Sequence, residues 1–321
     1  MRVFWATFCV ALGALVQTQA AEAETLKIAS PQRGSWESAI PALGQKNGIF
    51  KKHGLDLEIT STSGGGETMQ LVISGAVDIG LSAGTSGALG AFSRGAPIRI
   101  IGASSTGSQE LFWYVPSQSP LKSMREAKTN TIAYSTSGSS TQIAVLRFIS
   151  AYKLDAKPVA TGNPNLTFTQ VKSGQVEVGW SVAPFQLDAL EKGEVRLIAR
   201  ASDLPEIKTQ TVRVIIANAK LVEEKKDVLA RFMNAYRETI DWLYTNPQAI
   251  PQYMEFSGFS EPAVQRMLKE FIPKESLQTI YIDGLPEAQE DAVKYKFIKE
   301  PLSDKQIKEL IQIPPVSRVK G

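Results

Sequence analysis

Short β-rich segments alternate along the chain with amphipathic helical segments, and this alternation restricts the fold more than any other feature of the sequence. Residues 55–60 read Leu-Asp-Leu-Glu-Ile-Thr, with the period of two that a half-buried strand requires. A helical segment, 35–51, precedes this strand, and another, 67–74, follows it. Strands separated by helices form βαβ units, so the pattern predicts an α/β fold with parallel sheets.

The alternation occurs in two blocks, followed by a helical C-terminal part. Strand-like segments of the first block lie at 26–30, 55–60, 77–82 and 96–104. Those of the second lie at 111–115, 131–135, 159–161, 176–181 and 195–201, and a returning strand lies at 211–217. We predict two lobes joined by two crossings, near residues 105–110 and 205–212. The predicted boundaries are 24–106 for the first part of lobe 1, 107–211 for lobe 2 and 212–321 for the second part of lobe 1.

Helices are expected at 221–244, 260–271, 286–298 and 303–311 in the C-terminal part. Three of them have a start signal: Ser260, Pro286 and Ser303 are residue types that favour the first positions of a helix.

The N-terminus has the pattern of a secretory signal peptide. Arg2 is followed by the uncharged segment 3–16 and then by Ala21-Glu22-Ala23, a small-residue cleavage site. The alternative is a membrane anchor, but about 14 residues are too few to cross roughly 30 Å of hydrocarbon. We therefore interpret residues 1–23 as a cleavable signal and expect a periplasmic protein.

The scarcity of cysteine and histidine limits the chemistry of the chain. Cys9 is the only cysteine, and it lies inside the predicted signal; His53 is the only histidine. Zinc sites, thiol catalysis and Ser/His/Asp catalysis need more of these residues, so we expect no catalytic residue, no metal and no cofactor. A net charge of +3, from 35 Lys+Arg and 32 Asp+Glu without a dense basic cluster, argues against nucleic-acid binding.

Hydroxyl residues and glycines follow several of the predicted strands. In open α/β sheets this is where ligands bind, because the helix starts there offer free N–H groups and the positive end of the helix dipole. The loops in question contain Ser61-Thr62-Ser63-Gly64, Ala83-Gly84-Thr85-Ser86 and Ser135 to Thr141. Several such starts facing one cleft would bind a small anion or a polar head group. The alternative is that these residues only cap helices and form turns.

Three larger side chains are further candidates. Trp36 and Trp180 offer flat apolar surfaces to the body of an organic ligand, and core or interlobe packing is the alternative for both. Arg213 in the returning strand would neutralise an anion, unless it forms a salt bridge at the strand end.

Four segments resemble a known family. Residues 44–58 (GQKNGIFKKHGLDLE) contain a G-x-F-x-x-x-G-L-x-V/L signature, and 71–103 resemble the unit that follows it. Residues 132–154 and 171–180 (VKSGQVEVGW) resemble the matching units of a second lobe, with Glu177 where Asp is more usual. Together they are similar to the periplasmic solute-binding proteins of ABC importers, of the nitrate/sulfonate/taurine type, including those for thiamine precursors.

The resemblance implies a type II periplasmic binding fold with two lobes that close around a solute. It implies a monomer that delivers its solute to the permease and ATPase subunits of an importer. By position it assigns solute contacts to Gln32, Trp36, Ser63, Gly64, Thr85, Ser86, Ser137, Gly138, Ser139, Ser140 and Trp180. The expected solute is a sulfonate, a carboxylate or nitrate; a pyrimidine or thiamine precursor is the alternative. A same-fold enzyme, or a binding subunit that serves a sensor or another type of transporter, also remains open.

Overall fold

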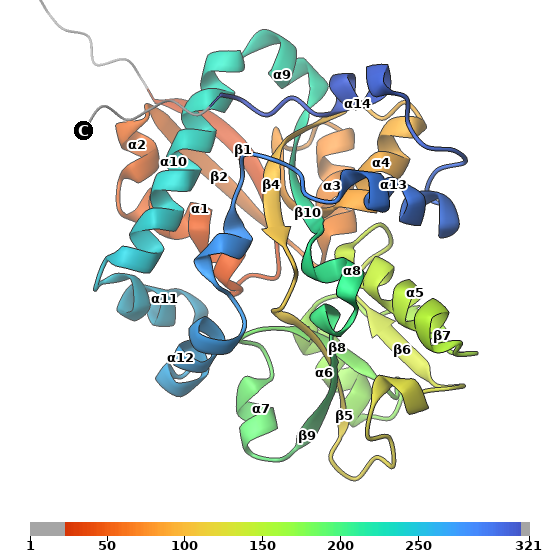
Figure 1. The fold of residues 1–321 in the computed structure, drawn as a ribbon. Helices are drawn as coiled ribbons and strands as arrows, with labels where there is room; N and C mark the ends of the chain where they lie inside the picture. The colour runs from red at the N-terminus through yellow and green to blue at the C-terminus, as the bar shows by residue number, and fades with distance from the viewer. Residues whose placement is uncertain (1–22, 316–321) are drawn as a thin grey trace, which may run out of the picture.

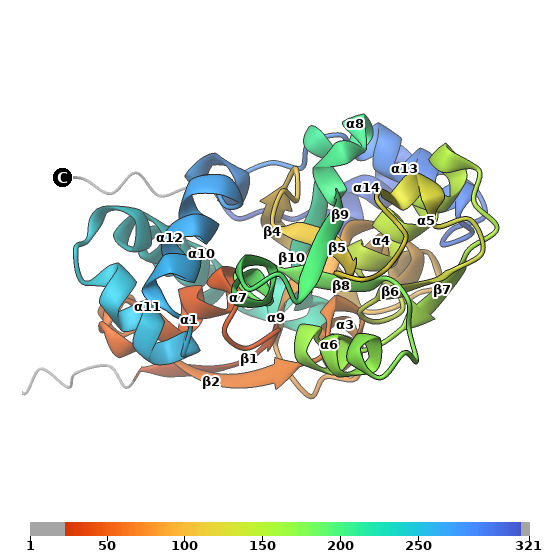
Figure 2. The same ribbon diagram turned by 90° about the horizontal axis from the view of Figure 1, so that it is seen from below.

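The computed structural model describes residues 23–315, which form two α/β lobes (Figure 1). The predicted signal peptide lies outside the described residues, except for Ala23 at its end. Figure 2 views the molecule from the side of the second lobe. Among the described helices, none combines the length and the apolar character that a membrane span requires.

The sheet of the first lobe has five strands in the order β2-β1-β3-β10-β4. Their bounds are β1 (Glu24–Pro31), β2 (Leu55–Thr62), β3 (Ile79–Gly84), β4 (Ile98–Thr106) and β10 (Thr211–Asn218). β1 runs parallel to β2 and β3, but β10 is antiparallel to both β3 and β4. The predicted parallel pairing is confirmed for β1, β2 and β3, but β10 makes the sheet mixed. The chain returns from the second lobe in the opposite direction, and its strand is inserted between two strands of the first block.

The second lobe repeats this arrangement. Its strands are β5 (Leu111–Pro116), β6 (Thr131–Tyr134), β7 (Lys157–Ala160), β8 (Gly179–Val182) and β9 (Val195–Arg200). β5 is antiparallel to β8 and β9, and β6 is parallel to β7. The Ala133 N–H donates to the Val178 carbonyl at 2.8 Å, which joins the two groups in the order β7-β6-β8-β5-β9. Each sheet thus contains one antiparallel strand that enters directly from the other lobe.

Helices follow the strands of both sheets and cover their faces. They are α1 (Trp36–Lys46), α2 (Ile49–Lys52), α3 (Gly65–Ile73), α4 (Thr85–Ser93), α5 (Ser140–Tyr152), α6 (Pro164–Lys172) and α7 (Leu187–Glu191). α1 places Trp36, Ala39, Ile40 and Leu43 on one buried face, at the spacing of an amphipathic helix. This face packs with Ile28 of β1, whereas the neighbouring Ala29 belongs to the cluster with α3 and α4 on the opposite face of the sheet.

Two connections join the lobes. Residues 107–110 link β4 to β5, and the 3-10 helix η2 (Ala201–Asp203) and α8 (Pro205–Lys208) lie between β9 and β10. A further 3-10 helix, η1 (Met124–Glu126), lies in the second lobe. The connections are close to the predicted crossings, and the division of the chain at 106/107 and 211/212 stays our proposal.

The C-terminal part is helical, as predicted. It contains α9 (Ala219–Glu224), α10 (Lys226–Thr245), α11 (Ala249–Ser257), α12 (Glu261–Glu270), η3 (Lys274–Leu277), α13 (Leu285–Lys294) and α14 (Asp304–Leu310). The expected helix 221–244 is two helices, because the backbone of Lys225 leaves the helical region at φ −134°. α10 packs on α1, whereas α12 reaches the second lobe, where Glu270 pairs with Arg200 at 3.3 Å.

Candidate functional site

Helix starts from both lobes meet at one contact. The starts of α3 and α4, in the first lobe, lie against the loop that precedes α5 in the second. The Gly66 N–H donates to Thr136 Oγ1 at 3.0 Å across this contact. A Cβ atom added to Gly84 or to Gly87 would collide with the carbonyl oxygen of Gly138. The two backbones therefore approach so closely that only glycine fits at the end of β3 and in the first turn of α4.

The helix starts at this contact differ in how they are capped. Gly64 and Gly84 precede α3 and α4, and neither provides a side-chain cap. By contrast, the Ser139 hydroxyl accepts the Gln142 N–H at the start of α5. The first N–H groups of a helix have no partner within the helix and carry its positive dipole end. Glycine caps leave such donors to partners from outside, and this arrangement suits an anion or a polar head group.

Most of the predicted loop residues lie in the segments that meet here. Thr85 is buried, and its hydroxyl donates to the Thr211 carbonyl at 2.7 Å. Gln32 is adjacent, since its Nε2 donates to the Ser63 carbonyl at 3.1 Å. The segments in contact contain Ser63, Gly64, Thr85, Ser86, Ser137, Gly138, Ser139 and Ser140. Ser86, Ser139 and Ser140 are buried in this arrangement of the lobes.

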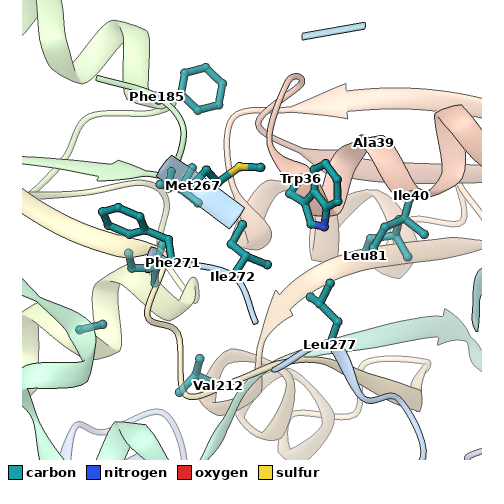
Figure 3. Close-up of a cluster of buried hydrophobic side chains, with 14 of the residues drawn as sticks. Trp36, Ala39, Ile40, Leu81, Phe185, Val212, Met267, Phe271, Ile272 and Leu277 are labelled. Atoms are coloured by element: carbon teal, nitrogen blue, oxygen red, sulfur yellow. The ribbon is translucent and has the colours of Figure 1, made fainter. Parts of the chain in front are cut away.

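The two tryptophans lie elsewhere. Trp36 is fully buried in the first lobe, edge-on to Tyr253 and Tyr244, with ring centroids 4.7 and 5.7 Å away. Figure 3 shows its ring among Leu81, Met267 and other apolar side chains.

Trp180 is equally buried, inside the second lobe. It lies opposite Trp113 in the β5–β8 ladder, and its Nε1 donates to Thr161 Oγ1 at 3.2 Å. Each tryptophan was predicted either to contact a ligand or to pack in the core. The described contacts are those of core packing for both.

Arg213 forms the salt bridge that was its alternative role. Its guanidinium pairs with Glu37 of α1 at 2.8 Å and with Glu110 of the first crossing. The hydroxyls of Ser82 and Ser104 donate to Glu37 Oε1 at 3.1 and 2.9 Å. All three charged side chains are buried. The charge of Arg213 is therefore balanced by the protein's own carboxylates.

The electrostatics of this cluster follow from burial and from its composition. Burial raises the pKa of Glu37, and the Glu110 carboxylate raises it further, although Arg213 acts in the opposite direction. Burial lowers the pKa of Arg213, but the two carboxylates raise it by more, so the pKa of Arg213 lies above its usual value. With two carboxylates around one guanidinium, the fully ionised cluster has an excess negative charge.

Sequence reasoning missed Glu37 and Glu110. Glu37 is an ordinary acidic residue in the first turn of a helix, and Glu110 is one polar residue in a connection. Neither carries a local signal, because they meet Arg213 only through the return of the chain into the first sheet.

His53 and the remaining acidic residues give no sign of a metal site. His53 follows α2, and its Nε2 lies 2.8 Å from Glu238 of α10. Within residues 23–315 no group of three or more His, Cys, Asp or Glu side chains is placed to hold a metal ion.

Solved structures of other proteins have a similar fold. The alkanesulfonate-binding protein SsuA from Xanthomonas axonopodis pv. citri, solved bound to MOPS, is similar with a TM-score of 0.77 and 18% identity, over 92% of this chain and 100% of that chain. The periplasmic nitrate-binding protein NrtA from Synechocystis PCC 6803 has a TM-score of 0.70 and 13% identity, over 91% and 86%. The desulfurization enzyme DSZB has a TM-score of 0.63 and 14% identity, over 90% and 96%.

The sequence comparison with curated proteins found no match. The family model described as NMT1/THI5 like matches residues 37–250, which is more than half of the chain and includes parts of both lobes. The fold that the sequence resemblance implies is confirmed by the solved structures. The chain belongs to the NMT1/THI5-like family and has the two-lobe periplasmic binding protein fold.

Proposed function

We propose that this chain is the periplasmic solute-binding component of an ABC importer, and that it captures a small anionic or polar organic solute between its lobes. One observation carries the proposal: in a chain of this family and fold, uncapped helix starts of the first lobe lie directly against the start of α5 in the second. The names of the sulfonate-binding and nitrate-binding proteins of the same fold agree with this solute class.

The head group is recognised by neutral donors. The contact offers backbone N–H groups at the starts of α3 and α4 and the hydroxyls of Ser86 and Ser140. The Thr85 hydroxyl already donates to the Thr211 carbonyl, and Arg213 is occupied by two carboxylates. N–H groups at helix starts stabilise a negative charge without a side-chain cation. An anion, or a polar group that accepts several hydrogen bonds, is therefore the class of solute that this site selects.

Closure couples binding to transport. Solute contacts from both lobes exist together only when the lobes are closed, so a bound solute shifts the population toward the closed form. The permease and ATPase subunits then act on the loaded, closed form. The start of β1 agrees with export, because its first residue, Glu24, directly follows the predicted cleavage site. Glu24 pairs with Arg231 at 3.1 Å, so the fold uses the residue that cleavage would leave first.

Binding without turnover is part of the proposal, although DSZB is an enzyme of the same fold. Catalysis in the described chain would have to proceed without a cysteine, and His53 is engaged with Glu238 at α10. A turnover assay with each solute that binds separates the two classes: the solute is expected to be recovered unchanged.

A ligand panel tests the function. The exported protein is examined by native mass spectrometry for a retained solute. Its thermal unfolding is then measured with sulfonates, nitrate, aromatic carboxylates, pyrimidines, neutral sugars and amino acids. A solute at about 100 times its Kd stabilises the folded state by about 2.7 kcal/mol. We expect an anionic member to give this shift and its neutral amide to give none. Stabilisation by neutral sugars or amino acids alone would overturn the anion assignment.

A further inference from the structure

A small hollow lies at the outer edge of the first lobe, between α1, β2 and α11. Its volume is about 170 Å³, and its lining includes Ser30, Arg33, Ile59, Ser61 and Phe256. Ser30 and Ser61 are paired in the parallel ladder of β1 and β2, and Ile59 precedes Ser61 by two residues on the same face of the edge strand. All of these residues belong to the first lobe and lie outside the interlobe contact, which is formed by Gly66, Gly84 and Gly87 with the loop before α5.

The floor of the hollow has an unsatisfied polar group. Ser30 is only 2% exposed, and its hydroxyl has no hydrogen-bond partner among the described residues. The nearby Ser38 hydroxyl is already engaged, because it accepts the Gly34 N–H and donates to the Ser35 carbonyl. A buried hydroxyl without a partner is costly to the folded state, so a ligand that accepts its hydrogen bond removes that cost.

A cation without an ion-pair partner lies at the rim of the hollow. The Arg33 side chain is exposed, and its guanidinium lies 5.9 Å from the centre of the Phe256 ring. It forms no ion pair with any residue in the described part of the chain. Arginine offers several N–H donors in a planar group that matches the two oxygens of a carboxylate.

We propose that this hollow is a second ligand site, which binds a small monocarboxylate with a short apolar tail. Arg33 binds the carboxylate, the Ser30 hydroxyl donates to one of its oxygens, and Ile59 and Phe256 contact the tail. The volume corresponds to about five or six molecules of liquid water, which is room for a ligand of the size of propionate. The site is independent of the proposed capture of a solute between the lobes.

Propionate is the probe, and propionamide is its neutral control. Binding is measured by saturation-transfer NMR on the mature protein and on the variants Ser30→Ala and Arg33→Gln. Each variant is expected to weaken propionate binding about tenfold or more, since each removes a hydrogen bond to a charged group. Lys51→Gln, which removes an equal charge from an exposed position of the same lobe, is expected to leave binding unchanged.

The unfolding temperature of Ser30→Ala distinguishes a ligand-binding role of the Ser30 hydroxyl from a structural role. Ser30→Ala removes no hydrogen bond of the folded protein, so its unfolding temperature is expected to equal or exceed that of the original chain. Gly87→Ala, which acts on the interlobe contact, is expected to retain propionate binding. Equal saturation transfer to propionate and propionamide, or propionate binding unchanged by both Ser30→Ala and Arg33→Gln, would overturn the proposal.

Discussion

At the scale of single residues, the buried cluster of Arg213, Glu37 and Glu110 connects three distant parts of the chain. Glu37 comes from α1, Glu110 from the first crossing and Arg213 from the strand that returns from the second lobe. Removing one member of a buried ionic group leaves the others uncompensated, which costs far more than breaking an exposed pair. The charge of Arg213 is therefore balanced inside the protein, and losing any one of the three side chains is expected to destabilise the fold at the junction of the lobes.

Arg213→Met is expected to lower the free energy of unfolding by about 3–5 kcal/mol, because it leaves two carboxylates buried without a cation. Arg266→Met is the matched control: Arg266 lies 3.7 Å from Glu191 and 3.5 Å from Glu270 in partly exposed pairs, which are worth about 0–1 kcal/mol. Urea unfolding of both variants measures the difference. Equal losses would show that the buried cluster has no special role in stability.

Glu37→Gln is expected to change the pH dependence of stability. Burial raises the pKa of Glu37 in the folded protein above the usual 4.5, so the folded state holds this proton more tightly than the unfolded state. The stability from this group is present at low pH and is lost as the pH rises from about 4.5 through the folded pKa. Glutamine does not titrate, so the stability of the variant relative to the original chain should increase with pH.

Urea unfolding of both proteins at about pH 4 and about pH 8 gives this comparison. A stability difference that is the same at both pH values would rule out the raised pKa of Glu37.

At the scale of elements, the helix starts were the most predictable part of the structure. Ser260 and Ser303 cap α12 and α14 as their sequence signals predict, and α13 begins beside Pro286. The polar segments after the strands were located only approximately, because Ala83 and Gly84 end β3 and Thr85 and Ser86 begin α4 with no loop between them. Most of these segments meet at the interlobe contact. These features depend on residues close together in the chain, where capping and periodicity act.

The parts that could not be predicted depend on long-range pairing. Nothing in residues 211–217 indicates that β10 is inserted antiparallel between β3 and β4. The partners of Trp36, Trp180 and Arg213 likewise come from segments far away in the sequence, so the tryptophans were equally consistent with a ligand contact until their neighbours were known.

The variant Gly87→Ala is expected to impair lobe closure without lowering the stability of the unliganded protein. Alanine favours a helix over glycine by about 1 kcal/mol, so the unliganded protein is expected to be no less stable. The added methyl group collides with the Gly138 carbonyl when the lobes meet, and solute affinity is expected to fall at least about tenfold. Calorimetric titration with the solute identified in the ligand panel, together with urea unfolding, measures both quantities.

Gly44→Ala is the matched control, because its methyl group would lie 2.7 Å from the Phe50 ring inside the first lobe. It is expected to lower stability by about 1–3 kcal/mol and to leave solute affinity unchanged. If Gly44→Ala lost solute affinity and Gly87→Ala kept it, the contact between Gly87 and Gly138 would not belong to lobe closure.

At the scale of the whole molecule, the two lobes are built on the same strand pattern and are joined by two crossings. α12 adds a third connection, since it pairs with the second lobe through Arg200 and Glu270. The proposed closure would change the overall dimensions of the molecule, and opening would separate the helix starts of α3 and α4 from that of α5.

Small-angle X-ray scattering with and without a solute that binds tests the central claim most directly. A compact chain of this length has a radius of gyration of about 19–20 Å, and we expect the unliganded protein to exceed this value and to approach it on saturation. Gly87→Ala, saturated with the same solute, is expected to stay at the larger value. A radius of gyration that does not change when the original chain is saturated would contradict capture by closure.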